Sequence, residues 1–153
     1  MNTAKYMTRT ILTVLLYLGF ASACAAETKP SAADNQAHSK AINDAIASVS
    51  SVKDAVAKFR LHHDAFPVSN AEAGVLPSAA FASSTIKRIE VGKNGMIEAT
   101  LTVESGVNDG VIRFVPAMSP QTDLNQVDWT CTTPSYSDIS DVTNSACVYG
   151  KNP

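Results

Sequence analysis

The chain has 153 residues, of which 45% are hydrophobic and 17% are charged, and its formal net charge is −2. This length suits one domain, and the composition is that of a globular protein with a single core, neither disordered nor embedded throughout in a membrane. Since the chain has no surplus of Lys and Arg with which to bind a phosphate backbone, nucleic acid is disfavoured as a partner.

The N-terminal segment has the pattern of a secretory signal peptide. Lys5 and Arg9 precede an apolar run at 11–20, and small residues follow at 21–23. This run is too short to cross a bilayer as a helix, so we expect residues 1–23 to be removed and the exported chain to have no transmembrane span. The product is then expected in the periplasm or at the cell surface of a Gram-negative type of cell.

Cys24, at the end of this signal, has two interpretations. In the first, it is the lipidated first residue of a mature lipoprotein, because Ala-Ser-Ala-Cys loosely resembles a lipobox, although Ala21 stands where a lipobox usually has Leu. In the second, cleavage follows Ala25 or Ala26, and Cys24 is discarded. The sequence leaves both open.

We expect a flexible tether at residues 24–36, because from Glu27 to Gln36 the segment is polar and has nothing to bury. Residues 37–62 are predicted to form an amphipathic helix, because apolar side chains recur at steps of three and four residues. Abundant Ala and the absence of Gly and Pro favour the helix. Its apolar stripe, which predicts packing against a sheet, consists of Ile42, Ile46, Val49, Val52, Val56 and Phe59.

The next segment, 64–84, lacks a regular pattern and is expected to be a loop that packs on the surface. Its anchors to the core are expected to be Phe66, Val75, Leu76 and Phe81.

Four strand patterns follow, each with apolar residues alternating with polar ones. They lie at 86–91, 97–103, 111–115 and 127–131. Asn94-Gly95 predicts a tight hairpin turn, because both residues tolerate positive φ, and Pro116 is expected to end the third strand. One long helix followed by four strands in meander order predicts an α+β domain, with a four-stranded antiparallel sheet laid on the helix.

Cys131 and Cys147 are the natural pair in an exported chain, since cysteines form bridges in an oxidising compartment. They enclose 15 residues, 132–146, for which the chain-entropy model gives about 3 kcal/mol of stabilisation. Their spacing is not that of a CxxC motif, so we expect a structural bridge rather than redox catalysis.

This arrangement resembles the type IV pilins and pilin-like proteins over roughly residues 37–150. The resemblance rests on the Ala-rich helix, the segments 66–74 and 94–100, Pro116 after an apolar strand, and Trp129, Thr130 and Cys131 before a late cysteine. It implies a pilin-like head over residues 37–153, in which the bridge from Cys131 to Cys147 closes the D-region, a variable surface loop often implicated in adhesion.

The N-terminal region departs from the family pattern. Pilins normally continue, after a Gly-Phe cleavage point, with a Thr-Leu-Ile-Glu type segment and a long apolar helix that forms the spine of the filament. Here Gly19-Phe20 is followed by Ala-Ser-Ala-Cys and then by charged sequence. We therefore expect a pilin-like head in which a signal peptide replaces the spine helix.

No residue pattern predicts a cofactor, a metal site or catalysis. His62-His63-Asp64 has metal-ligand residue types, but nothing completes a ligand shell. Asp138, Asp141 and Asn144 carry oxygen ligands for calcium without the spacing or the Gly of an EF-hand. There is no Gly-x-Ser-x-Gly elbow, so an enzyme is not expected.

Four residues of the loop are the candidates for contact with a protein or glycan surface, or with pilus components. They are Tyr136, Asp138, Ile139 and Asp141. The apolar pair among them has a second interpretation, as a small core beneath the loop. The functional hypothesis is a non-enzymatic pilin-like structural or interaction protein that takes part in type IV pilus-related adhesion. The alternative is a periplasmic accessory subunit that docks onto pilus or type II secretion components through its helix.

Overall fold

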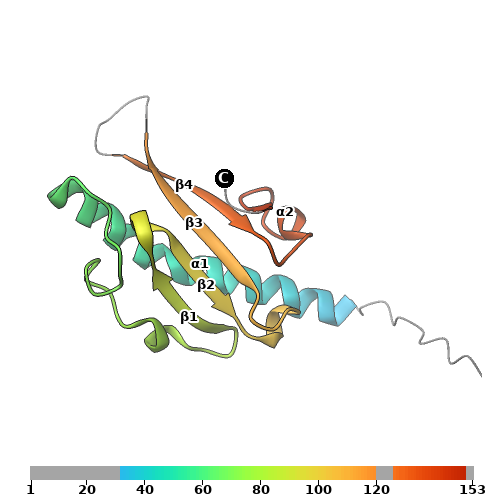
Figure 1. Ribbon diagram of the computed structural model, residues 1–153. Coiled ribbons are helices and arrows are strands. Elements are labelled where there is room, and N and C mark those ends of the chain that lie inside the picture. The colour runs from blue at the N-terminus through green and yellow to red at the C-terminus, as the bar shows by residue number, and fades with distance from the viewer. Residues whose placement is uncertain (1–31, 120–125, 151–153) are drawn as a thin grey trace, which may run out of the picture.

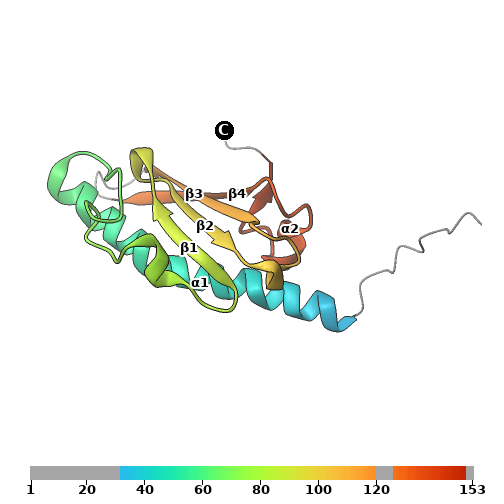
Figure 2. The ribbon, with the colours of Figure 1, turned by 60° about the horizontal axis from the view of Figure 1, so that its bottom comes forward.

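The computed structural model describes residues 32–119 and 126–150. The long helix α1 (Ala32–His63) lies along one face of a five-stranded sheet (Figure 1 and Figure 2). The strands lie side by side in chain order, and they are β1 (Ile86–Val91), β2 (Ile97–Leu101), β3 (Val111–Met118), β4 (Val127–Thr133) and β5 (Val148–Tyr149). The short elements are the 3-10 helices η1 (Ser78–Phe81), η2 (Lys93–Gly95) and η3 (Val103–Ser105), and the helix α2 (Ile139–Val142). The predicted α+β architecture is confirmed.

Helix α1 begins at Ala32 rather than at residue 37, and it packs through the predicted stripe. The most deeply buried residues of that stripe, each 0% exposed, are Ile42, Val49, Val52 and Val56. Ile46 and Phe59 lie at its margins and are half-buried. The helix ends where Asp64 adopts a positive φ of 53° and its amide donates to the carbonyl of Arg60.

The sheet covers this stripe with the alternate residues of its strands. The buried face consists of Ile86, Ile89, Val91, Ile97, Ala99, Leu101, Ile112 and Phe114. In β1 a strict alternation would place Ile86 on the opposite face from Ile89. The register shift between Ile86 and Arg88 removes this conflict, because an extra residue in one strand reverses the faces of the residues beyond it.

The turn between β1 and β2 contains the predicted Asn94 and Gly95, but it is longer than a tight hairpin turn. Asn94 and Gly95 both have positive φ, of 58° and 73°, within the 3-10 turn η2. The amide of Gly95 donates to the carbonyl of Pro67 at 2.8 Å, which ties the turn to the loop after α1. A Cβ at Gly95 would lie 3.0 Å from the Phe66 side chain, so this position needs glycine for space as well as for φ.

The predicted end of the third strand was wrong. Strand β3 continues through Pro116, whose Cα partner is Trp129 of β4. Since the pairing with β2 reaches only to Phe114, this part of β3 has a partner strand on one side, and such an edge tolerates a residue without an N–H.

Two other strand predictions need correction. Val103 belongs to η3 and is 63% exposed, because the chain turns away after Leu101 and the Ser105 hydroxyl bonds back to the carbonyl of Thr102. The sheet also has five strands rather than four. The additional strand β5 runs parallel to the end of β4, with Thr132 opposite Val148.

The loop after α1 is packed on the core, as expected, but with different anchors. Phe66, Val75 and Phe81 contact the core, whereas Leu76 is 60% exposed and is not an anchor. Asn70, a polar residue that the pattern did not single out, is 9% exposed.

Candidate functional site

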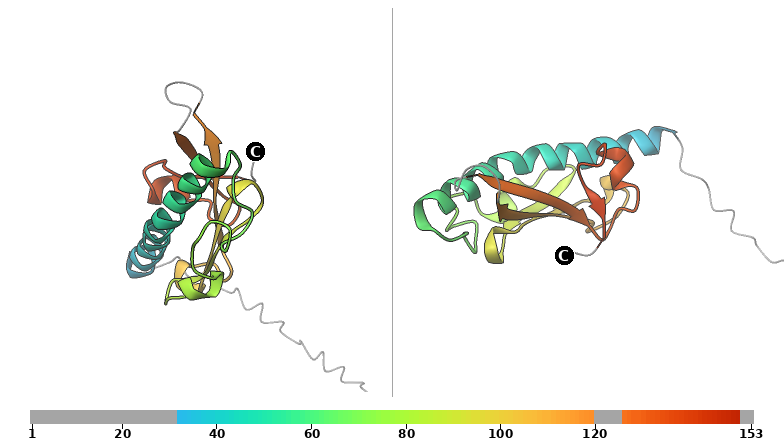
Figure 3. Two further views of the ribbon diagram at one scale, coloured as in Figure 1. Left: turned by 90° about the vertical axis from the view of Figure 1, so that its left-hand side faces the viewer. Right: turned by 90° about the horizontal axis from the view of Figure 1, so that it is seen from above.

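The disulfide joins Cys131 at the end of β4 to Cys147 just before β5, and both cysteines are buried. The segment between them contains α2 and lies against the N-terminal half of α1 and against η3 (Figure 3). We call residues 132–146 the disulfide loop. The predicted bridge is thus present, and the bridged segment is part of the packed domain.

Tyr136 and Ile139 are the core of the disulfide loop. They are 2% and 0% exposed, so the second interpretation of this pair, a core beneath the loop, is the one that the structure supports. The hydroxyl group of Tyr136 lies 2.6 Å from the hydroxyl oxygen of Ser105. Burial raises the pKa of Tyr136, and the hydrogen bond with Ser105 opposes part of this rise. The phenol therefore stays neutral at physiological pH.

Asp138 and Asp141 are the two candidates that remain on the surface. The carboxylate of Asp138 accepts a hydrogen bond from Nε2 of His38 at 3.0 Å, across 100 residues of sequence. The other ring nitrogen of His38, Nδ1, lies 2.5 Å from the carbonyl oxygen of Ser105. His38 thus links α1, η3 and the disulfide loop. Nothing in its sequence context, a polar segment at the start of a helix, indicates this role.

A shallow groove of about 400 Å³ runs beside this contact. Val107 and the ring of Tyr136 give it an apolar wall, and His38 and Asp138 give it a polar rim. The groove joins the exposed part of the disulfide loop to the start of α1.

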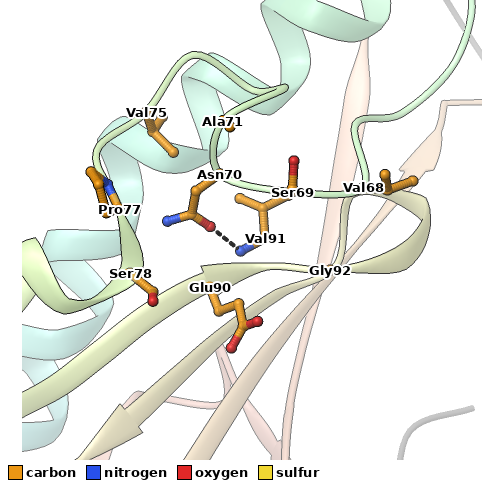
Figure 4. Close-up of a pocket in the computed structure, with 10 residues that line it drawn as sticks. All are labelled: Val68, Ser69, Asn70, Ala71, Val75, Pro77, Ser78, Glu90, Val91 and Gly92. Carbon is orange, nitrogen blue, oxygen red and sulfur yellow. Dashed lines mark hydrogen bonds between the residues drawn. The ribbon is translucent and has the colours of Figure 1, made fainter.

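A second depression, of about 350 Å³, lies between the loop after α1 and the outer edge of β1 (Figure 4). Asn70 stands at its base. Its Oδ1 accepts a hydrogen bond from the amide of Val91 at 2.6 Å, and its Nδ2 donates to the carbonyls of Ile89 at 3.0 Å and Leu76 at 2.8 Å. The side-chain amide of Asn70 therefore pairs with β1 as a neighbouring strand would.

We expect Asn70→Ala to lower the free energy of unfolding by about 2 kcal/mol, because the substitution leaves buried backbone groups without partners. Chemical denaturation measures this loss. The control is Asn43→Ala, which removes one exposed bond, to the carbonyl of Ser39, and should change stability by less than about 0.5 kcal/mol. Equal losses in the two variants would contradict the assigned role of Asn70.

Lys53 of α1 is half-buried and lies beside two aromatic rings. Its Nζ lies 4.0 Å from the ring centre of Phe114 and 5.6 Å from that of Trp129. Burial lowers the pKa of Lys53, and the two rings stabilise the charged form through cation–π contacts. The residue fastens α1 to β3 and β4.

The other expectations concern metals and membranes. Within residues 32–119 and 126–150, no three His, Cys, Asp or Glu side chains are grouped as a metal site. His63 stacks on Phe59, with ring centres 4.1 Å apart.

Of the helices in this part of the chain, none combines the length and the apolar character that crossing a membrane requires. Cys24, the lipidation candidate, lies outside the described residues, as do the signal peptide and most of the tether.

A family model described as Pilin (bacterial filament) matches residues 37–147, which include most of α1, strands β1 to β4 and the disulfide loop. No curated protein sequence matches the chain.

Proposed function

This chain belongs to the pilin family of bacterial filament proteins, and on that premise we propose that it acts in type IV pilus-related adhesion through its disulfide loop. The family is structural rather than enzymatic, and its members are exported to the cell surface within pili. Two parts of this proposal are specific to this chain. They are that the disulfide loop makes the adhesive contact, and that the N-terminal signal peptide directs export.

The observation that supports this proposal is the contrast between the inside and the outside of the disulfide loop. Tyr136 and Ile139 fix the loop from below, while Asp138 and Asp141 are exposed above them. The loop has no Lys or Arg between residues 132 and 146. A rigid acidic surface loses little conformational entropy on binding, and it favours a partner with basic or hydrogen-bond-donating groups.

We expect Asp141→Lys to weaken binding by on the order of tenfold, because it places a like charge against a basic partner surface. The purified exported protein would be measured on an array of neutral and amino-sugar glycans and on immobilised pili from the producing cell. The matched control is Asp128→Lys, which makes the same charge change at an exposed position of β4. Equal losses in the two variants, or no binding by the unsubstituted protein, would contradict the proposal.

The alternative proposal is a periplasmic accessory subunit that docks onto pilus or type II secretion components through α1. It is favoured by a hollow of about 550 Å³ between the C-terminal half of α1 and residues 72–74. Lys58→Glu, at the rim of this hollow, would abolish capture of such components if the alternative holds. Asp141→Lys would then leave their capture unchanged.

A further inference from the structure

His38 has a hydrogen-bond acceptor at each of its two ring nitrogens. Nδ1 faces the carbonyl oxygen of Ser105 at 2.5 Å, and Nε2 faces a carboxylate oxygen of Asp138 at 3.0 Å. The His38 side chain is 18% exposed, so water has limited access to the ring, while that of Asp138 is 52% exposed.

The two acceptors determine which form of the ring fits. A neutral imidazole carries one N–H and one lone pair, so it can donate to only one of these oxygens and must turn its lone pair toward the other. The imidazolium carries two N–H groups and can donate to both. The bond to Asp138 is then also an ion pair, and bonds between charged groups are stronger than neutral ones.

We propose that protonated His38 is a pH-dependent clasp that holds the disulfide loop against α1 and η3. When His38 loses its second proton, one of its two bonds is lost, and Asp138 no longer has a cationic partner at this position. Histidine is the side chain that ordinarily changes its charge near neutral pH. The attachment of the loop at His38 therefore responds to the acidity of the medium outside the cytoplasm.

Among the side chains that the structure describes, few charged groups other than Asp138 lie around His38. From the disulfide loop, Asp138 and the ring of Tyr136 face it, the ring centres of Tyr136 and His38 being 5.8 Å apart. From the turn at η3, a Cβ on Gly106 would lie 3.1 Å from Nδ1, and Glu104 is exposed beside Ser105. On α1, Lys40 is paired with Asp44. Of the carboxylates whose side chains are described, Asp138 is the one that His38 meets.

The clasp adds a form of regulation to the proposed function, because Asp138 belongs to the proposed contact surface. Its effect on adhesion therefore rests on that proposed function. The clasp itself is independent of any partner. In the clasped state the Asp138 carboxylate is ion-paired with His38, and in the open state it has no cationic partner at this position, which favours a basic group of a binding partner. The groove beside Tyr136 borders the same residues.

The test is nuclear magnetic resonance of the isotope-labelled exported protein without a partner, between pH 5.5 and pH 8.5. We expect both ring nitrogens of His38 to carry protons at the acidic end, and the backbone amide signals of residues 136–141 to shift as His38 titrates. In His38→Gln these loop shifts should disappear. In His62→Gln, which changes an exposed histidine, they should persist.

Folding equilibria give a second readout. Because the doubly protonated ring can make both bonds and the neutral ring only one, the clasp should contribute more stability at low pH than at high pH. The folding equilibrium constant of the unsubstituted protein, relative to that of His38→Gln, should be roughly fivefold larger at pH 5.5 than at pH 8.5.

Two results would overturn the clasp: a stability difference that is the same at both pH values, or loop amides that titrate in His38→Gln as they do in the unsubstituted protein. Asp138→Asn is a second variant in case His38→Gln fails to fold, because it alters only a surface side chain. It should also reduce the pH response of the loop. Since no partner is present, a failed clasp leaves the adhesion proposal standing, and failed adhesion leaves the clasp standing.

Discussion

Replacing Gly110 with Ala is expected to lower the free energy of unfolding by about 3 kcal/mol, through overpacking of the core of the disulfide loop. A Cβ at this position would lie 2.0 Å from the hydroxyl oxygen of Tyr136 and 2.5 Å from the ring carbon that bears it. Tyr136 is 2% exposed and is bonded to Ser105, so it cannot move aside without giving up that bond. Denaturant unfolding followed by circular dichroism measures the loss.

Two variants separate this clash from a general effect of replacing glycine. Gly74→Ala is the control, because Gly74 has a φ of +69° but nothing within 4 Å of the added Cβ, and it should cost only about 1 kcal/mol. Tyr136→Leu removes the atoms that collide, so Gly110→Ala should add little destabilisation in that background. Additive losses in the double variant would show that the two residues do not collide.

Removal of the disulfide by Cys131→Ala with Cys147→Ala is expected to cost about 3 kcal/mol, the chain-entropy value for a loop of 15 residues. The bridge also holds β5 in place, because Val148 and Tyr149 pair with Thr132 and Thr133 just beyond it. Loss of the bridge should therefore release β5 as well as the loop. Thermal unfolding and hydrogen exchange of the β5 amides measure the two effects.

The control for this prediction is reduction. Dithiothreitol should bring the unsubstituted protein to the stability of the double variant and should leave the double variant unchanged. A background of Cys24→Ser removes the third cysteine from the comparison. If reduction and substitution gave different stabilities, the loss would come from the packing of the buried sulfur atoms rather than from the bridge.

The parts of the fold that depend on local pattern were predictable from the sequence. The spacing from Ile42 to Val56 predicted the buried side of α1, and Asn94-Gly95 predicted the residues of positive φ between β1 and β2. Both rest on neighbours in sequence, whose periodicity carries the information. The pairing of Cys131 with Cys147 followed from the count of cysteines and from the expected compartment.

The contacts that shape the loop and the sheet edge were not predictable in this way. Pro116 continues a strand because of where its neighbour β2 ends, which no local pattern records. His38 meets Asp138 across 100 residues, and Asn70 reaches β1 across 19 to 21 residues. Each has an ordinary local context, so only the assembled tertiary structure shows its role. The acidic residues of the loop could be identified from the sequence. Whether Tyr136 is exposed or buried could not be decided from the sequence, and its packing in the structure shows that it is buried.

Because the side-chain amide of Asn70 pairs with the edge strand β1, it affects how this chain behaves when many copies lie close together. Subunits of a filament are brought close together at high local concentration, and a free strand edge would then invite sheet-to-sheet polymerisation. On the β1 side, the side-chain amide of Asn70 bonds the carbonyl of Ile89 and the amide of Val91. The hydroxyl of Ser83 accepts from the amide of Ile86, and the amide of Ser83 donates to the carbonyl of Ile86. On the other side, β5 has only two residues. Asn70 and Ser83 thus leave β1 without a continuous free template, which suppresses amyloid-like addition of strands on that side of the sheet.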